Sequence, residues 1–418
     1  MFLAFQRESV FMNLRSITVG SNLRKEGNEA TIRKAAGVVA AVRRRLTERY
    51  PKVRTTRLCT QPLIEIDDLN PEGVGRLVKE VDRICRSEGV DWFCTPIGEC
   101  YDNTHLKFVK TLPTIMRSSD IAFSNVIATH GGRINFEVIL ECARQVLKIS
   151  RLRSDGFDNF RFCVSANVKP NGAFFPYSWH RGEDGFSIGL EAIDLIIGSV
   201  RAGGGLIEIR DRIREALSTE LEKIDSIARE VESESGVKYY GLDLSLAPYP
   251  TESQSIGRAV ECLGAEIFGV NGTLFLTSYL TNILKCLERD LPIRTVGFTG
   301  VMYPVLEDRY LAHSNDEGFL SVDSLLLYSS VCGCGPDMIP LPGDISEREV
   351  ASIMLDMSAL ALILDKPLVA RLVPIPRRRK GQRTKFNYHF FHNTKVMAAR
   401  NRSLRRKMLR ATSSFEFL

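Results

Sequence analysis

The chain has 418 residues, 44% of them hydrophobic and 25% charged, a composition typical of globular proteins and unlike that of disordered chains. Its longest apolar runs are far shorter than the roughly 20 residues that cross a bilayer, and its first eleven residues carry Arg7 and Glu8 where a signal peptide needs an unbroken apolar stretch. We therefore expect a cytoplasmic protein with no membrane segment.

Extended apolar segments alternate with amphipathic helical segments over the first half of the chain. This alternation predicts an α/β fold. The expected strands are 14–20, 53–63, 91–97, 120–128 and 160–168. The expected helices are 29–50, 72–87, 105–116, 134–149 and 185–200.

The alternation continues in the second half. A long helix is expected at 206–235, followed by a strand at 238–246, and the segments that complete the pattern are 272–289, 294–301, 319–331, 346–364 and 368–373. Ser346 and Glu349 have the spacing of a capping box, which predicts a helix start there. Because no linker or repeat interrupts the pattern, we expect one domain over 12–397.

The loop 331–344 has the highest density of functional groups. It contains the thiols of Cys332 and Cys334, the carboxylates of Asp337 and Asp344, and six Gly or Pro residues. Such a segment cannot be a regular helix or strand, and fixed loops are where function concentrates on a rigid scaffold. The ten cysteines are scattered through the chain, so we expect free thiols rather than disulfides.

Carboxylates at strand ends and in loops are the candidate general acids and bases. They are Asp243, Glu307, Asp308, Asp337 and Asp344. Active sites of α/β barrels gather at such positions. For each residue the alternative is helix capping or turn formation.

Two further polar groupings are candidate ligand contacts. Asn167 and His180 flank an aromatic-rich segment after a strand, which suits the mouth of a small-ligand pocket. Arg133 and Asn135 lie at a strand-to-helix turn, where a cation and an amide are placed to hold a carboxylate or phosphate. The alternatives are an aromatic plug for the first group and an ordinary surface arginine for the second.

The C-terminal end is strongly basic. Residues 371–418 contain fourteen Lys or Arg residues and one acid, Glu416, whereas the net charge of the whole chain is +6. The tail 398–418 is therefore either a solvated segment or an arm that contacts nucleic acid. The lack of any base-reading motif favours the first interpretation.

Several long segments resemble an uncharacterised family, known as domain of unknown function 711 or uncharacterised protein family 0210. These segments are LRSITVGSNL, FCVSANVKPNGAFFPYSWH, FSIGLEAIDLI, YGLDLSLAPYP, VGFTGVMYPVLEDRYLA, SVCGCGPDMIPLPGDIS and KPLVARLVPIP. The resemblance spans about 12–397, so residues 1–11 are expected to be a start-site extension. It implies a closed α/β barrel similar to pyruvate formate-lyase and the anaerobic ribonucleotide reductases, and it hints at an ACT-domain protein as a partner. It supplies no reaction.

Three chemistries are considered for the cysteine loop. A glycyl radical mechanism is disfavoured because the motif-like Gly297 precedes Cys332 and lies far from the C-terminus. A thiolate mechanism is disfavoured because Cys332 follows the C-terminal end of the expected helix 319–331, where the dipole raises a thiol pKa. Zinc binding by the two cysteines with His389 and His392 is disfavoured by spacing, so neither a metal nor a cofactor is assigned.

The sequence thus predicts a cytosolic homo-oligomer that binds a small polar metabolite in a barrel cavity. Cys332, Asp337, Asp243 and Asp344 are the expected catalytic residues, and the reaction is unassigned. The alternative is a non-catalytic ligand sensor that works with a partner.

Overall fold

The computed structural model describes residues 12–400, 402–405, 407–408 and 413–417. The expected N-terminal extension, residues 1–11, lies outside this part of the chain. None of the helices in the described residues is long and apolar enough to span a membrane.

A nine-stranded sheet forms the centre of the protein. Its path is β10-β9-β1-β2-β3-β5-β8-β12, with β4 paired to β5. All pairings along it are parallel except β1 with β9 and β8 with β12. The strands are β1 (Asn13–Ser21), β2 (Val53–Thr60), β3 (Trp92–Cys94), β4 (Gly98–Glu99), β5 (Ala122–Ile127), β8 (Phe162–Ala166), β9 (Gly185–Glu191), β10 (Lys238–Asp243) and β12 (Leu368–Ala370). The mixed α/β class with a large, mostly parallel sheet is confirmed.

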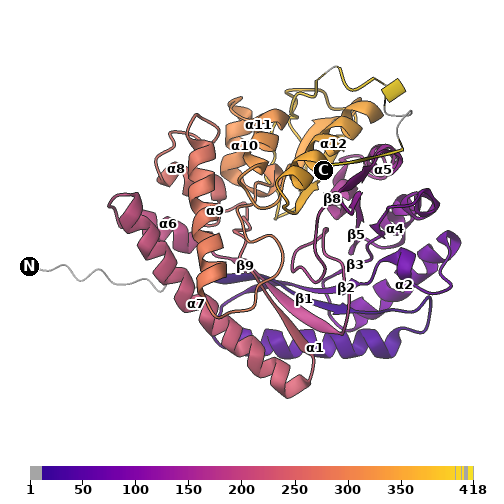
Figure 1. Cartoon of the computed structure of the whole chain (residues 1–418), viewed down its shortest axis with the longest axis horizontal. Coiled ribbons are helices and arrows are strands. Elements are labelled where there is room, and N and C mark those ends of the chain that lie inside the picture. Colours follow the sequence, from indigo (N-terminus) through magenta and orange to yellow (C-terminus); the bar gives the residue numbers. More distant parts are fainter. Residues whose placement is uncertain (1–11, 401, 406, 409–412, 418) are drawn as a thin grey trace, which may run out of the picture.

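Helices surround the strands, which lie towards the middle of the view in Figure 1. They are α1 (Glu29–Thr47), α2 (Pro71–Ser87), α3 (Leu106–Val109), α4 (Leu112–Ser118), α5 (Phe136–Ile149), α6 (Ile193–Arg201), α7 (Leu206–Ser235), α8 (Ile256–Cys262), α9 (Thr273–Asp290), α10 (Arg309–Asp316), α11 (Val322–Ser329) and α12 (Glu347–Ile363). In α2, for example, Val74, Leu77, Val78 and Val81 are buried at helical spacing, and Asn70 caps the first turn. At the start of α12, Ser346 and Glu349 form the predicted capping box.

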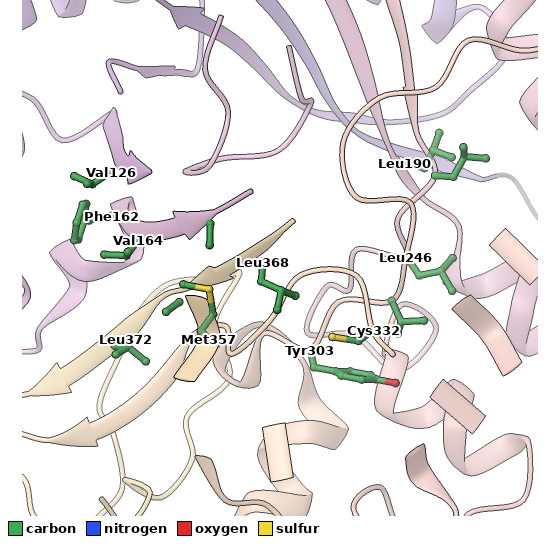
Figure 2. Packing of buried hydrophobic residues seen from close by; sticks show 14 of the residues in the cluster. Val126, Phe162, Val164, Leu190, Leu246, Tyr303, Cys332, Met357, Leu368 and Leu372 are labelled. Atoms are coloured by element: carbon green, nitrogen blue, oxygen red, sulfur yellow. The ribbon is translucent and has the colours of Figure 1, made fainter. Parts of the chain in front are cut away.

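The space between sheet and helices is filled by one large hydrophobic core. Figure 2 shows part of it, where Val126 of β5 and Phe162 and Val164 of β8 lie near Met357 of α12. Side chains on both faces of these strands are buried, as expected for parallel strands covered by helices.

Some expected elements were wrong. The segment 185–200 is not one helix, because β9 runs over its first half and α6 begins only at Ile193. The segment 294–301 forms no regular strand and carries only isolated bridges at Thr295 and Val301. The expected helix 105–116 is divided at Lys110 and Thr111 between α3 and α4.

Irregular segments lie between the two ends of the sheet. Leu242 and Leu246 bridge to Thr295 and Val301 in parallel register. Backbone hydrogen bonds then join Gly333 N to Val301 O at 2.7 Å and Val369 N to Cys334 O at 2.7 Å. The backbone from β10 to β12 is thus connected on this side through 295–301 and 333–337.

Two small sheets complete the fold. One pairs β11 (Ile339–Pro342) with β13 (Leu372–Ile375) in parallel. The other joins β6 (Thr129–His130), β7 (Arg133–Asn135) and β14 (Ser414–Glu416). Part of the basic tail therefore returns to the body of the protein as a strand.

Candidate functional site

A cavity of about 350 Å³ is lined by residues of the large sheet and of the loops beside it. Its walls come from segments far apart in sequence, including β1, β2, β3, the aromatic segment 174–177 and the loop around Cys334. The cavity is partly open, and its lining combines aromatic side chains with a similar number of charged ones. Concave sites with apolar walls and placed polar groups are the common form of small-molecule sites.

The first charged group at the cavity is the pair Arg15 and Arg54, which line it and are held from behind by Glu191. This fully buried carboxylate accepts hydrogen bonds from Arg15 Nη1 at 3.0 Å and from Arg54 Nε at 2.6 Å. Arg54 also stacks on the ring of Tyr249, with 3.6 Å between its Cζ and the ring centroid. Arg15 reaches further, to Glu307 at 2.9 Å. Each arginine is thereby neutralised and fixed in orientation.

The second charged group is centred on Arg371, which follows β12. Its Nε donates to Asp337 Oδ1 at 2.5 Å, and its Nη2 donates to Asp337 Oδ2 at 2.9 Å and to Glu307 Oε1 at 2.6 Å. Because all three side chains are buried, this bidentate pairing satisfies charges that would otherwise be costly to bury. The nearby carboxylates keep the pKa of Arg371 above its ordinary value although burial acts in the opposite direction.

The cysteine loop enters the cavity wall through Cys334 and Asp337 rather than Cys332. Cys332 is buried in the main core, where Figure 2 shows it beside Tyr303. The loop does fold inward, and Glu307 joins Asp337 in the cavity, so the structure brings together these two of the predicted acids.

The pKa of Cys332 is lowered, whereas the sequence predicted that the helix end would raise it. Hydrogen bonding with the Cys334 thiol, and then the charge of Lys366, lower the pKa of Cys332 to about 6, against the effect of burial. The expected helix 319–331 ends at Ser329, and the ammonium of Lys366 donates to the carbonyls of Ser329, Ser330 and Cys332. Lys366 therefore offsets the dipole at the helix end. Because Lys366 is distant in sequence, the residues near Cys332 could not reveal this effect.

Asp243 lies outside the cavity, in a buried hydrogen-bond network. It accepts hydrogen bonds from the Tyr177 hydroxyl at 2.9 Å, the Ser245 hydroxyl at 2.6 Å and the amides of Phe298 and Thr299. Burial raises its pKa. Gly297, at φ +78°, packs so closely that an added Cβ would overlap the Asp243 carboxylate. Asp243 thus positions Tyr177, which lines the cavity, and fixes the 297–299 turn.

Three other predicted residues are used in capping or lie at the surface. Asp308 accepts amide hydrogen bonds from Tyr310 and Leu311 at the start of α10 and from Ile256 of α8. Asn135 accepts from Glu137 N and Val138 N, both at 3.1 Å, at the start of α5. Asp344 is exposed in the loop before α12.

The remaining predicted ligand contacts also lie away from the cavity. Arg133 forms an exposed ion pair with Glu416 at 2.6 Å. Asn167, at φ +58°, donates to Asp365 Oδ1 at 3.0 Å. His180 is fully buried, and its Nδ1 lies 2.9 Å from Asn171 Oδ1.

The residues considered for zinc binding and for a glycyl radical lie in different surroundings. Across the described ranges, no three His, Cys, Asp or Glu side chains gather in a way that could hold a metal ion. His389 lines the cavity, but it lies there with Tyr249 and Phe390 rather than with Cys332. Gly297 is required by its close approach to Asp243, which accounts for the motif-like sequence without a radical.

The main residues that sequence reasoning missed are cationic and aromatic. They are Arg15, Arg54, Arg57, Arg371, Trp92 and Tyr249. A signal for two of them was present, because Arg54 and Arg57 interrupt the otherwise strand-like segment 53–60. Charged residues in a strand that is buried on both faces need partners or a cavity.

This chain is similar to proteins whose family names state no activity. A family model described as "Uncharacterised ACR (DUF711)" matches residues 8–392. A UPF0210 protein of Pyrobaculum arsenaticum is 28% identical over 79% of this chain and 75% of its own length. UPF0210 proteins of Desulfovibrio desulfuricans and Syntrophobacter fumaroxidans are 26% and 25% identical over 86% and 90% of this chain, and over 82% and 88% of their own lengths.

Proposed function

This chain belongs to the uncharacterised DUF711 family, and we propose that it is a cytosolic enzyme that binds a small polar metabolite in the cavity between β1, β2, β3 and the cysteine loop. The observation that carries the proposal is the convergence of buried charged side chains from distant segments on one cavity. Charged groups are rarely buried without a partner or a function, so their gathering around a cavity supports ligand binding.

We also infer that the large sheet closes into a barrel around this cavity. Two runs of parallel chain support the inference. One is β1, β2, β3, β5 and β8, and the other is β9, β10, 295–301, 333–337 and β12, with antiparallel contacts where the runs meet. Closure leaves no exposed strand edge and encloses a ligand-sized interior.

Asp337 is the residue best placed to act on a bound metabolite. Its carboxylate lines the cavity and is oriented by both Nε and Nη2 of Arg371. A carboxylate held in this way can accept a proton or a hydrogen bond from a bound molecule at a fixed position. The reaction remains unassigned.

The first experiment identifies the metabolite. The purified chain is incubated with a small-molecule cell extract, washed and denatured, and the released compounds are identified by mass spectrometry. We expect a compound that raises the unfolding temperature of the wild type but not of Ala247→Phe, which fills the cavity wall. Ala202→Phe, at an exposed position after α6, is the control. Equal binding by wild type and folded Ala247→Phe would contradict the cavity as the site.

A non-catalytic sensor is the second candidate, because every carboxylate that lines the cavity is already engaged. Asp91 accepts from Thr56 N and Oγ1, both at 2.8 Å, while Glu307 and Asp337 are paired with arginines. Asp337→Asn separates the two functions. In an enzyme it abolishes turnover of the identified metabolite, whereas the exposed control Asp344→Asn leaves turnover unchanged. Binding with no product from the wild type under any assay would favour the sensor.

A further inference from the structure

Arg57 is a buried cation without a carboxylate partner. It lies on β2, is 2% exposed and lines the cavity. Within the described part of the chain, no Asp or Glu oxygen lies within 4.0 Å of its guanidinium nitrogens. Arg161 and Arg371 are similarly buried, yet each has at least one ion pair. Arg57 is therefore the exception among the buried arginines.

The contacts that Arg57 does make hold it in place without giving it an ion pair, although the charges of Glu307 and Asp91 partly offset its burial. Its Nε donates to Thr55 Oγ1 at 2.9 Å, and its Nη1 lies 3.5 Å from Ala173 O. Its Cζ lies 5.0 Å from the ring centroid of Trp92 and 5.1 Å from that of Phe175. Burial, and then the charge of Arg15, lower its pKa to about 9, so it is still charged at neutral pH. Isolated buried charges are costly, which favours an anion as the missing partner.

The other charges of the cavity limit what this anion can be. Three carboxylates, Glu191, Glu307 and Asp337, together balance the charges of the three arginines that they pair with, which are Arg15, Arg54 and Arg371. Lys52 is exposed. One buried guanidinium without an ion pair is matched in charge by one carboxylate, and inorganic phosphate is kept as a probe because Lys52 is a second cation at the cavity wall. The Trp92 and Phe175 rings, which also line the cavity, offer apolar surface to the rest of the ligand.

We propose that the metabolite is a monocarboxylic acid with an aromatic or apolar body, whose carboxylate pairs with Arg57 while its body packs against Trp92 and Phe175. This inference rests on the proposed function, because it names the class of molecule that the cavity binds. A planar guanidinium supplies parallel N–H donors to a carboxylate, a geometry that a lysine cannot reproduce.

Binding of matched probes to the full-length protein tests the proposal. The probes are phenylacetate, benzoate, the neutral phenylacetamide and inorganic phosphate, measured by calorimetry and by unfolding temperature. We expect saturable binding of at least one aryl carboxylate, no binding of the amide, and affinity weakened tenfold or more in Arg57→Met. Arg57→Lys, which keeps the charge, should bind more weakly than the wild type. Arg33→Met, at an exposed arginine of α1, is the matched control and should bind as the wild type does.

The outcomes separate this inference from the proposed function. If Arg57→Met binds aryl carboxylates within twofold of wild type, or if the amide or phosphate binds in their place, the carboxylate assignment is overturned. Loss of that same binding in Ala247→Phe would leave the cavity function standing. If no probe binds while an extract metabolite does, the carboxylate class is also overturned. If neither probes nor extract compounds bind, both proposals fail.

Discussion

His180 shows how burial sets the ionisation of a single residue. Its ring is fully buried over Gly20, where an added Cβ would overlap it. Nδ1 has Asn171 as its partner, whereas Nε2 has no hydrogen-bond partner in the described structure. Burial lowers the pKa of His180 to about 4, so the imidazole is neutral at physiological pH. The residue is therefore placed to support the 171–180 segment rather than to hold an anionic ligand.

This lowered pKa predicts a pH dependence of stability. The unfolded chain binds a proton at His180 near pH 6.5, whereas the folded chain does not until about pH 4. The unfolded state therefore binds more protons between these values, and stability is lost as pH falls through this window, by up to about 3 kcal/mol. Urea unfolding at several pH values should show this extra loss in the wild type relative to His180→Gln. The exposed control His313→Gln should follow the wild type. A constant difference between wild type and His180→Gln over the window would contradict the prediction.

At the scale of elements, the sequence predicted best where one face of a helix is apolar. Helices α2, α5, α7 and α12 lie close to their expected bounds because their buried side chains recur at helical spacing. The prediction of one helix over 185–200 was wrong because β9 is buried on both faces. Such a strand is an apolar run without a two-residue period. The segment 294–301 forms no regular strand because it is joined to the sheet only through single bridges to residues distant in sequence.

Only part of the candidate site could be predicted, because its residues come from segments far apart in sequence. Asp337 and Glu307 were two of five acids that the sequence offered as candidates. The other three, Asp243, Asp308 and Asp344, lie outside the cavity, because acids at strand ends and in loops also serve as caps and turn residues. The arginines of the cavity could not be assigned, because their partners come from other strands: Glu191 lies 137 positions from Arg54 and Glu307 lies 64 positions from Arg371. Ion pairs between residues so far apart in sequence depend on the order of the strands in the sheet, and local sequence patterns do not reveal that order.

Asn135 was predicted to contact a ligand, but the structure shows it as the N-cap of α5, and this capping role can be tested. Asn135 accepts two of the amide hydrogens at the start of α5, so Asn135→Ala should lower the free energy of unfolding by about 1 kcal/mol. Asn135→Asp keeps an acceptor at the same position and should retain most of the stability. Denaturant unfolding measures both variants. If Asn135→Ala instead weakens binding of the extract metabolite without loss of stability, the capping role is wrong.

At the scale of the whole molecule, the barrel closure that we propose would depend on a close contact between two irregular segments. Gly300 and Gly333 approach so closely that a Cβ on Gly300 would overlap the backbone of Gly333. Beside this contact, Leu246 N donates to Gly300 O at 2.9 Å and Gly333 N donates to Val301 O at 2.7 Å. Glycine at both positions lets the backbones of 295–301 and 333–337 lie side by side without regular strand pairing.

Hydrogen exchange tests whether these bonds close the barrel. If the sheet is closed, the amides of Leu246, Gly333 and Val369 should exchange as slowly as those of β1, because opening them requires disruption of the whole ring. Gly300→Ala should speed exchange in both 295–301 and 333–337, since the two segments must separate to admit the methyl group. Gly37→Ala is the matched control, because a Cβ at Gly37 of α1 would meet no other atom within 4 Å. The contradicting result would be that, in the wild type, these three amides exchange as fast as those of exposed loops. The sheet would then have two free ends, and the cavity would lack the closed wall that the proposed binding requires.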